Sequence, residues 1–253
     1  MTPLTYGYFG EHRSGSTWIV DVLHSICRHV HIGMPIYGEE FGPERGHDVL
    51  VVDVNADVSR LEVIRTFRAF HVIRDPRDGV VSTYSSHKYS LPDGQWLAEQ
   101  RALLDQESLK DAVNHSIDFR SEQFPRLAEW NYVDSRVYET KFENLIEDPP
   151  AGFRVVLSFL DLFLCRITPP MLDEVLDYYT FQRLSGGRRR GQEVVFSHYR
   201  RGSPGDWRSY FGPRGTSYFK ERHRNPIDFP GLRDRPQQVA WMWCVILHWD
   251  TIA

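Results

Sequence analysis

Two hydrophobic periods alternate along this chain and predict strands separated by helices. Near-continuous apolar runs, rich in β-branched and aromatic residues, occur at 48–54 (DVLVVDV) and 68–75 (RAFHVIRD), as expected of strands covered on both faces. TYGYFG (5–10) and SRVYETKF (135–142) are further strand candidates. Between 16 and 30, apolar residues instead recur at helical spacing. This alternation predicts an α/β fold with a central parallel sheet and crossover helices.

Helix signals flank these strands. Pro76 suits the first turn of a helix that follows the second apolar run. The stretch 108–130 has a helical pattern with an interruption at Pro125, and 168–184 opens on a Thr-Pro start signal and continues as a helix. The region 185–214 is rich in Gly, Arg and Ser, which predicts irregular structure.

Length and composition are those of an ordinary globular protein. The 253 residues suit a single domain, predicted to span 1–223 and to be followed by an atypical tail at 224–253. The formal net charge of -4 gives no general attraction to nucleic acid or acidic membranes. We find no signal peptide and no run of the ~20 apolar residues that a membrane span needs. The 3 cysteines lack metal-site spacing. We therefore expect a cytoplasmic protein without a metal site.

The first chemical motif is GEHRSGST, which begins at Gly10 between a predicted strand and a predicted helix. Nucleoside-triphosphatase loops have the pattern G-x-x-x-x-G-K-[ST], whose lysine reaches the outer phosphates. Gly10, Gly15 and Thr17 fit this pattern, whereas Ser16 occupies the lysine position and Arg13 is the nearest cation. Backbone N–H groups at the helix start would form an anion site. The simpler alternative is a helix N-cap by one of the two loop serines, with an arginine on the surface.

A second motif follows the strand at 68–75, in HVIRDPRDGVVSTYSSHK. Arg74 closes this buried strand, and Ser82 lies in the second turn of the next helix. These two residues can converge on a phosphate at the carboxyl edge of the sheet, where α/β proteins bind ligands. The alternative is an exposed Arg74–Asp78 ion pair, which would contribute little.

The third motif is YRRGSPGDWRSYF (199–211). Its two arginines and glycine can surround a phosphate, and Asp206 and Trp207 are expected to anchor this loop. Without a ligand, the two arginines are expected to lack partners. Just upstream, GGRRRG (186–191) is interpreted as a solvated charge run in a mobile loop.

Together and in this order, the three motifs resemble the sulfotransferases that use 3′-phosphoadenosine 5′-phosphosulfate (PAPS). The family's 5′-phosphosulfate loop resembles HRSGSTW, its RDPxDxxxSxY motif for the 3′-phosphate resembles RDPRDGVVSTY, and its late RKGxxGDW motif resembles RRGSPGDW. FENLIEDP is similar to a family stretch like YEDLxxDP, with phenylalanine at the position of the usual adenine-contacting tyrosine. The resemblance implies an α/β fold with a P-loop-like core and these nucleotide-binding residues: Arg13, Ser14, Gly15, Ser16, Thr17, Trp18, Arg74, Ser82, Phe142, Phe181, Arg200, Arg201 and Gly202.

The resemblance also implies the reaction, which is transfer of a sulfuryl group from PAPS to a hydroxyl of a small-molecule, sugar or lipid acceptor. Adenosine 3′,5′-bisphosphate (PAP) is then the product. Arg13 and the loop N–H groups would stabilise the charge that develops during transfer. A base must take the acceptor proton: Glu40 and Glu39, beyond the first helix, are the first candidates, and Asp53, at the end of the second strand, follows them. The sequence does not identify the acceptor, and it is compatible with a homo-oligomer.

Two other functions fit parts of the pattern. A P-loop kinase or NTPase would use the same turn between strand and helix, but the missing loop lysine argues against it. A catalytically inactive nucleotide-binding protein would retain all three motifs, and the atypical tail keeps this alternative open.

Overall fold

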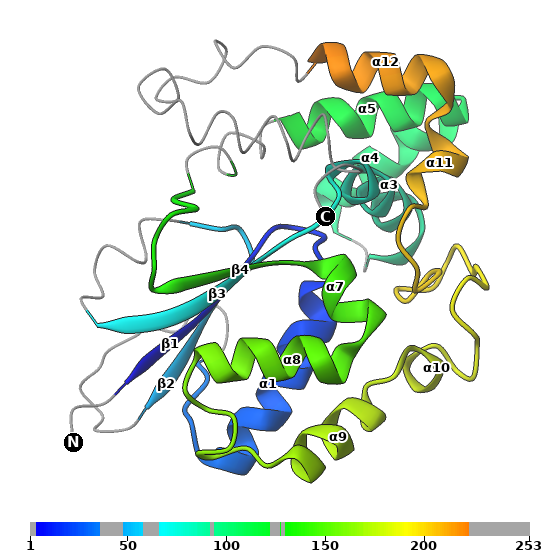
Figure 1. The fold of residues 1–253 in the computed structure, drawn as a ribbon. Coiled ribbons are helices and arrows are strands. Elements are labelled where there is room, and N and C mark those ends of the chain that lie inside the picture. Colours follow the sequence, from blue (N-terminus) through cyan, green and yellow to red (C-terminus); the bar gives the residue numbers. More distant parts are fainter. Residues whose placement is uncertain are drawn as a thin grey trace. The chain divides into compact units, whose positions relative to one another are not determined.

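Four parallel strands form one sheet in the computed structural model of the protein (Figure 1). The strand order is β2-β1-β3-β4, and every neighbouring pair is parallel. The strands are β1 (Thr5–Gly10), β2 (Val49–Asp53), β3 (Phe67–Ile73) and β4 (Val137–Lys141). Each corresponds to a strand candidate of the sequence, so the predicted α/β class with a central parallel sheet is confirmed.

The structure describes residues 4–35, 48–57, 66–91, 94–121, 127 and 130–222. The chain divides into two compact units, of which the first contains the sheet. The first unit comprises Met1–Arg74 and Asn131–Arg183, and the second comprises Asp75–Trp130 and Leu184–Ala253.

Helices cover one face of the sheet in the first unit (Figure 1). Tyr8 and Phe70 from the strands pack with Ile19, Val22 and Phe153 from the helices in the main core. Burial of a large apolar side chain contributes roughly 1.5–3 kcal/mol, so this face fixes α1 firmly against β1 and β3. The helices are α1 (Ser16–Val30), α7 (Phe142–Glu147), α8 (Pro149–Phe159) and α9 (Pro169–Tyr178), and the short α10 (Phe181–Leu184) follows.

Among the described residues of the second unit, the regular elements are helices. Its elements are α3 (Pro76–Ser85), the π-helix η2 (Ser86–Ser90), α4 (Gln95–Gln106), α5 (Leu109–Ser121), α11 (Trp207–Tyr210) and α12 (Gly212–Arg222). α5 packs against both α3 and α12 (Figure 1). Pro76 opens α3 as predicted, and the side chain of Asp75 caps this helix by accepting from the Arg77 N–H at 2.9 Å.

One predicted helix is interrupted. The pattern over 168–184 predicts a continuous helix, but α9 ends at Tyr178 and α10 begins at Phe181. The Tyr179 carbonyl accepts a hydrogen bond from Trp18 Nε1 at 2.9 Å. A long-range contact thus takes the place of a helical hydrogen bond and overrides local propensity.

Candidate functional site

The phosphate loop, residues 10–17, leads from β1 into α1. Gly15 is the N-cap residue of α1, and its φ of 80° lies in the left-handed region that favours glycine. Arg13 is also left-handed, with φ 72°. The first N–H groups of a helix have no partner within the helix, and the helix dipole favours an anion there. The loop therefore has the backbone of an anion site.

The loop serines close the loop instead of capping the helix. Ser14 is buried, and its Oγ donates to the Glu11 carbonyl at 2.7 Å and accepts from the Glu11 N–H at 3.1 Å. Ser16 Oγ donates to the same carbonyl at 3.2 Å. The alternative of an N-cap at Ser14 or Ser16 is wrong, because the N-cap is Gly15 and no side chain caps it. Thr17, the second residue of α1, is exposed.

Phe142, the first residue of α7, packs directly on the loop. A Cβ atom on Gly15 would lie 2.1 Å from a ring carbon of Phe142. The guanidinium of Arg74 lies over the same ring, with Cζ 5.1 Å from the ring centroid. Arg74 Nη1 also donates to the Arg13 carbonyl at 3.1 Å. The arginine of the second motif therefore touches the first motif, both by hydrogen bond and through Phe142.

Aromatic rings continue from Phe142 toward α1. Trp18 meets Phe142 edge-on with ring centroids 6.3 Å apart, and meets Phe153 in the same way at 5.6 Å. The indole N–H of Trp18 is held by the Tyr179 carbonyl. Phe181 begins α10 two residues later and is half-buried. Rings of this kind can contact the planar base of a nucleotide.

Of the three candidate bases, the structure describes only Asp53. Glu39 and Glu40 lie outside the described residues. Asp53 ends β2 and is buried, and its Oδ1 accepts from the N–H groups of Asn55 at 2.8 Å and Asp57 at 3.2 Å. These bonds hold the turn after β2. A catalytic role for Asp53 stays a prediction.

A buried polar cluster in the first unit was not predicted from the sequence. His71, in the interior of β3, lies beside Glu139 of β4, with 2.7 Å between Nδ1 and Oε2. The ring of Tyr132 is 6.0 Å from that of His71. Burial raises the pKa of Tyr132, and the charges of Glu11 and Glu139 raise it further. The available sequence signal is the histidine inside the otherwise apolar run FHVI.

The second unit carries Ser82 and the third motif. Of the 10 residues of α3, Ser82 alone is not buried. Asp78, one helical turn earlier, is only 1% exposed. Its Oδ2 accepts from the Gly205 N–H at 2.7 Å and its Oδ1 from the Trp207 N–H at 2.9 Å. Asp78 is therefore not a surface residue. Its carboxylate fastens the third motif to α3 at Gly205 and Trp207.

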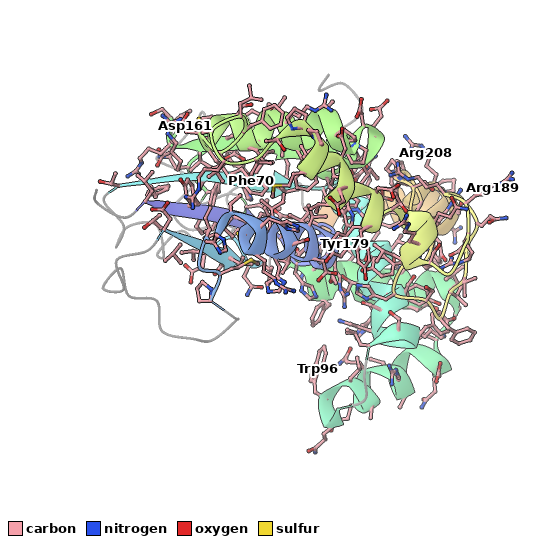
Figure 2. The ribbon with its side chains drawn as sticks, turned by 90° about the horizontal axis from the view of Figure 1, so that it is seen from below. Phe70, Trp96, Asp161, Tyr179, Arg189 and Arg208 are labelled. Atoms are coloured by element: carbon pink, nitrogen blue, oxygen red, sulfur yellow. The ribbon has the colours of Figure 1, made fainter. Side chains whose placement is uncertain are left out.

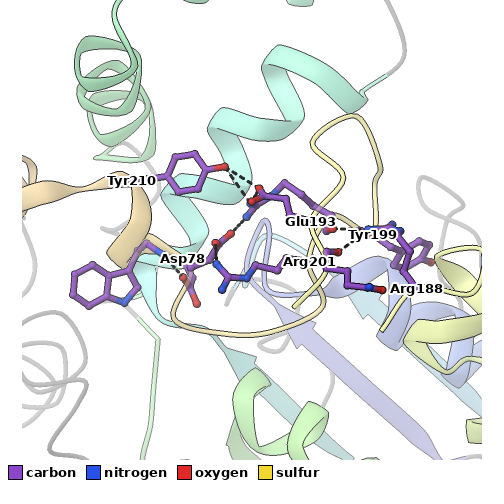
Figure 3. A network of polar contacts seen from close by, with 10 residues as sticks. Asp78, Arg188, Glu193, Tyr199, Arg201 and Tyr210 are labelled. Atoms are coloured by element: carbon purple, nitrogen blue, oxygen red, sulfur yellow. Dashed lines mark hydrogen bonds and ion pairs between the residues drawn. The ribbon is translucent and has the colours of Figure 1, made fainter. Parts of the chain in front are cut away.

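The arginine loop, residues 185–206, contains its own counter-ions. Arg200 forms ion pairs with Glu193 and with Asp206, and Arg201 binds Asp206 at 2.7 Å (Figure 3). Tyr210 Oη donates to Glu193 at 2.9 Å. Asp206 is buried, and a buried carboxylate needs such partners. The prediction that these arginines lack partners without a ligand is wrong.

Trp207 anchors the end of the arginine loop, as predicted. The Arg77 guanidinium lies over its ring, with Cζ 3.8 Å from the ring centroid. Arg77 also donates to both oxygens of Asp75, from Nε at 2.9 Å and from Nη2 at 2.8 Å. Burial raises the pKa of Asp75 against the opposing effect of Arg77. Gly202, with φ 69°, turns the backbone directly after the two arginines of the loop.

The charge run GGRRRG is not uniformly solvated. Arg188 makes five hydrogen bonds within the arginine loop. Arg189 is exposed, and its side chain points away from the protein (Figure 2). The interpretation as a solvated run is therefore wrong for Arg188 and right for Arg189.

The fold and the loop at 10–17 define an α/β protein with a turn suited to an anion at the carboxyl end of a parallel strand. Among the described residues, no group of three or more His, Cys, Asp or Glu could hold a metal ion. Within the same part of the chain, no helix is long and apolar enough to cross a membrane.

Comparisons with known proteins identify the family of this chain. A sequence profile of the sulfotransferase domain matches residues 63–228. The structure of mouse sulfotransferase SULT7A1 complexed with PAP matches with a TM-score of 0.50 and 15% identity, over 93% of this chain and 89% of that one. Retinol dehydratase in complex with androsterone and inactive cofactor PAP matches with a TM-score of 0.56 and 13% identity, over 88% and 81%. A comparison with curated protein sequences gave no match.

Because the profile covers most of the chain, this protein belongs to the sulfotransferase domain family. Sulfuryl transfer is accordingly its reaction, and the predicted membership of the sulfotransferase family is confirmed. The matched range includes Arg74, Ser82 and the arginine loop but begins after the phosphate loop. Mouse sulfotransferase SULT7A1 and retinol dehydratase share the overall fold of this chain.

Proposed function

We propose that this sulfotransferase takes its sulfuryl group from PAPS, whose 5′-phosphosulfate binds to the phosphate loop. The contact of Arg74 with the Arg13 carbonyl carries this proposal. A nucleoside triphosphate needs a loop lysine for its outer phosphates, and this loop has Ser16 there. PAPS has a single phosphate and a sulfuryl group at its 5′ end, so the lysine is not required.

The 3′-phosphate of PAPS is assigned to Arg74, Ser82, Arg200, Arg201 and Gly202. Arginine suits this task because its charge is permanent and its planar fork matches phosphate oxygens. The partial exposure of Ser82 on an otherwise buried helix supports its part in this assignment. The adenine ring is assigned to Trp18, Phe142 and Phe181, as follows from the resemblance and from the ring contacts of Trp18 and Phe142.

In the proposed reaction, the acceptor hydroxyl oxygen forms a bond to sulfur while the bond between sulfur and the 5′-phosphate oxygen breaks. The acceptor proton passes to a carboxylate, for which Glu40, Glu39 and Asp53 are the candidates in that order. PAP leaves with the electron pair of the broken bond. Arg13 and the N–H groups at the start of α1 stabilise the charge that grows on that oxygen and on the transferred group.

The acceptor is proposed to be a hydroxyl of a small molecule, sugar or lipid. The structures of retinol dehydratase contain androsterone in one case and retinol in another, which supports a small-molecule acceptor here. In this chain, Tyr89 and Trp96 are proposed as parts of an apolar acceptor wall. Tyr89 packs edge-on against Phe196 at 5.2 Å, and Trp96 is 49% exposed. An acceptor screen with labelled PAPS would identify the compound.

The donor assignment is tested by measuring PAP, adenosine 5′-phosphate and ATP binding to the wild-type protein and to Arg74→Ala. A charge-assisted hydrogen bond contributes about 1.5–3 kcal/mol, so PAP should bind roughly tenfold to a hundredfold more weakly to the variant. Adenosine 5′-phosphate should change little. Arg68→Ala is the matched control, because Arg68 lies on β3, the strand that leads to Arg74, and its side chain is 50% exposed.

Three results would contradict the proposal in different ways. Equal losses for PAP and adenosine 5′-phosphate would remove the 3′-phosphate from Arg74. A wild-type preference for ATP over PAP would favour a P-loop kinase or NTPase. Tight PAP binding with no turnover of labelled PAPS on any acceptor would favour an inactive nucleotide-binding protein.

A further inference from the structure

Arg188 is the most extensively bonded side chain of the arginine loop. Its Nε donates to the Ser185 carbonyl at 3.1 Å. Its Nη1 donates to the carbonyls of Gln192 at 3.0 Å and Arg200 at 2.7 Å. Its Nη2 donates to the Tyr199 carbonyl at 2.6 Å and to the Ser197 hydroxyl at 2.9 Å (Figure 3). A guanidinium has five N–H donors, and all five are used inside the loop.

This saturation separates the role of Arg188 from that of Arg200 and Arg201. Because all five N–H groups of Arg188 already donate within the loop, its guanidinium is not available to bind a phosphate. Four of its five bonds instead end on main-chain oxygens of the loop, among them the carbonyls of Tyr199 and Arg200. The main chain is fixed from the other side too: the Arg200 carbonyl accepts from the Val194 N–H at 3.1 Å, and the Arg201 carbonyl from the Gly191 N–H at 2.8 Å.

From this geometry we infer that Arg188 is a positioning residue that sets the backbone of Arg200 and Arg201, and thereby the selectivity for the 3′-phosphate of the donor. The inference rests on the proposed function. The carbonyls of both arginines are bonded to the loop interior, which fixes where their side chains leave the backbone. Lysine cannot replace Arg188, because it has three donors at a single point instead of five in a planar fork.

The test compares Arg188→Lys with Arg189→Lys, two substitutions that keep the charge of the same run. Arg189 is the matched control because its side chain is exposed. The first readout is the ratio of the dissociation constants for adenosine 5′-phosphate and PAP, which reports selectivity for the 3′-phosphate. We expect this ratio to fall roughly tenfold or more in Arg188→Lys and to stay unchanged in Arg189→Lys, with adenosine 5′-phosphate affinity intact in both.

The second readout needs no ligand. Hydrogen exchange of the Gly191 and Val194 amides reports whether the Arg200 and Arg201 carbonyls remain in place. We expect faster exchange at both amides in Arg188→Lys only. This readout stays valid if wild-type protein shows no preference for PAP, a result that would overturn the proposed function instead.

Two outcomes would overturn the inference. Normal hydrogen exchange and normal nucleotide selectivity in Arg188→Lys would show that the five bonds do not position the backbone of Arg200 and Arg201. An equal loss of affinity for both nucleotides, with a lower melting temperature, would show a general contribution to folding in place of positioning. Arg188→Ala, measured by the same two readouts, should reproduce the effects of Arg188→Lys, because the lost fork geometry and not the charge is decisive.

Discussion

The phosphate loop and the arginine loop both suit anions, but they are stabilised in different ways. The phosphate loop depends on shape: Gly15 has no room for a Cβ atom beside Phe142, and Ser14 closes the turn on Glu11. The arginine loop depends on charge: Arg200 and Arg201 are paired with carboxylates of the same loop.

The physical reason for the difference is the group that meets the ligand. Main-chain N–H groups carry only partial charges, and a rigid turn can hold them without counter-ions. Full positive charges that are partly buried are costly without a partner, so the protein supplies Asp206 and Glu193. Substitutions that change the shape of the phosphate loop should therefore destabilise it most. The arginine loop should be destabilised most by substitutions that remove its charges.

The largest effect is expected for Gly15→Ala. An alanine at φ 80° is strained, and its methyl group would overlap the Phe142 ring. Left-handed strain costs about 1–2 kcal/mol per residue and overpacking typically a further ~1–3 kcal/mol. Denaturant unfolding and PAP titration should both show a large loss. Gly187→Ala is the control, since Gly187 has φ 96° but no atom within 4 Å of an added Cβ. Equal effects of the two substitutions would show that contact with Phe142 is unimportant.

Asp206→Asn should have the next largest effect. The variant leaves Arg200 with Glu193 as its carboxylate partner and removes the carboxylate that pairs with Arg201. Breaking a buried ion pair costs about 3–5 kcal/mol, and we expect roughly 2–3 kcal/mol because Arg201 is partly exposed. The free energy of unfolding in urea measures this loss. Asp177→Asn, which breaks an exposed pair with Arg183, should change it by less than about 0.5 kcal/mol. Similar values for both variants would contradict the charge-based account of the arginine loop.

Ser14→Ala should destabilise the phosphate loop moderately. It leaves the buried N–H and carbonyl groups of Glu11 each without one hydrogen bond, at a cost of about 1–2 kcal/mol. Ser16→Ala should cost less, because Ser16 is half-buried and makes a longer bond to that carbonyl. The free energies of unfolding of the two variants test this ranking. A larger loss for Ser16→Ala than for Ser14→Ala would contradict it.

The smallest effect is expected for Glu193→Gln, and it should depend on pH. Burial acts to raise the pKa of Glu193, but hydrogen bonds from Arg200 and Tyr210 outweigh it and lower the pKa below the usual value. A lowered pKa contributes stability above the pKa of the unfolded state, and this stability is lost as pH falls through the folded pKa. The stability difference between wild type and variant should thus be small at neutral pH and vanish in acid. A difference that persists in strong acid would exclude the ionised carboxylate as its source.

Local patterns predicted much of the fold and part of the site. The four strands follow from short apolar runs, and the start of α3 follows from Pro76, because these signals act on neighbouring residues. The break between α9 and α10 does not follow, since it depends on Trp18, far away in the sequence. The pairing of His71 with Glu139 depends on the register between β3 and β4, which single-sequence patterns do not contain.

The sequence by itself determined the order of the elements, the three motifs and the missing loop lysine, and these indicated a sulfotransferase. Tertiary structure alone decided which of two loop serines is buried and which of two adjacent arginines organises the arginine loop. Neighbours such as Arg188 and Arg189 carry the same chemistry and the same local propensity. They differ only in the direction of their side chains, and therefore in whether carbonyls from elsewhere in the loop come within reach of their donors.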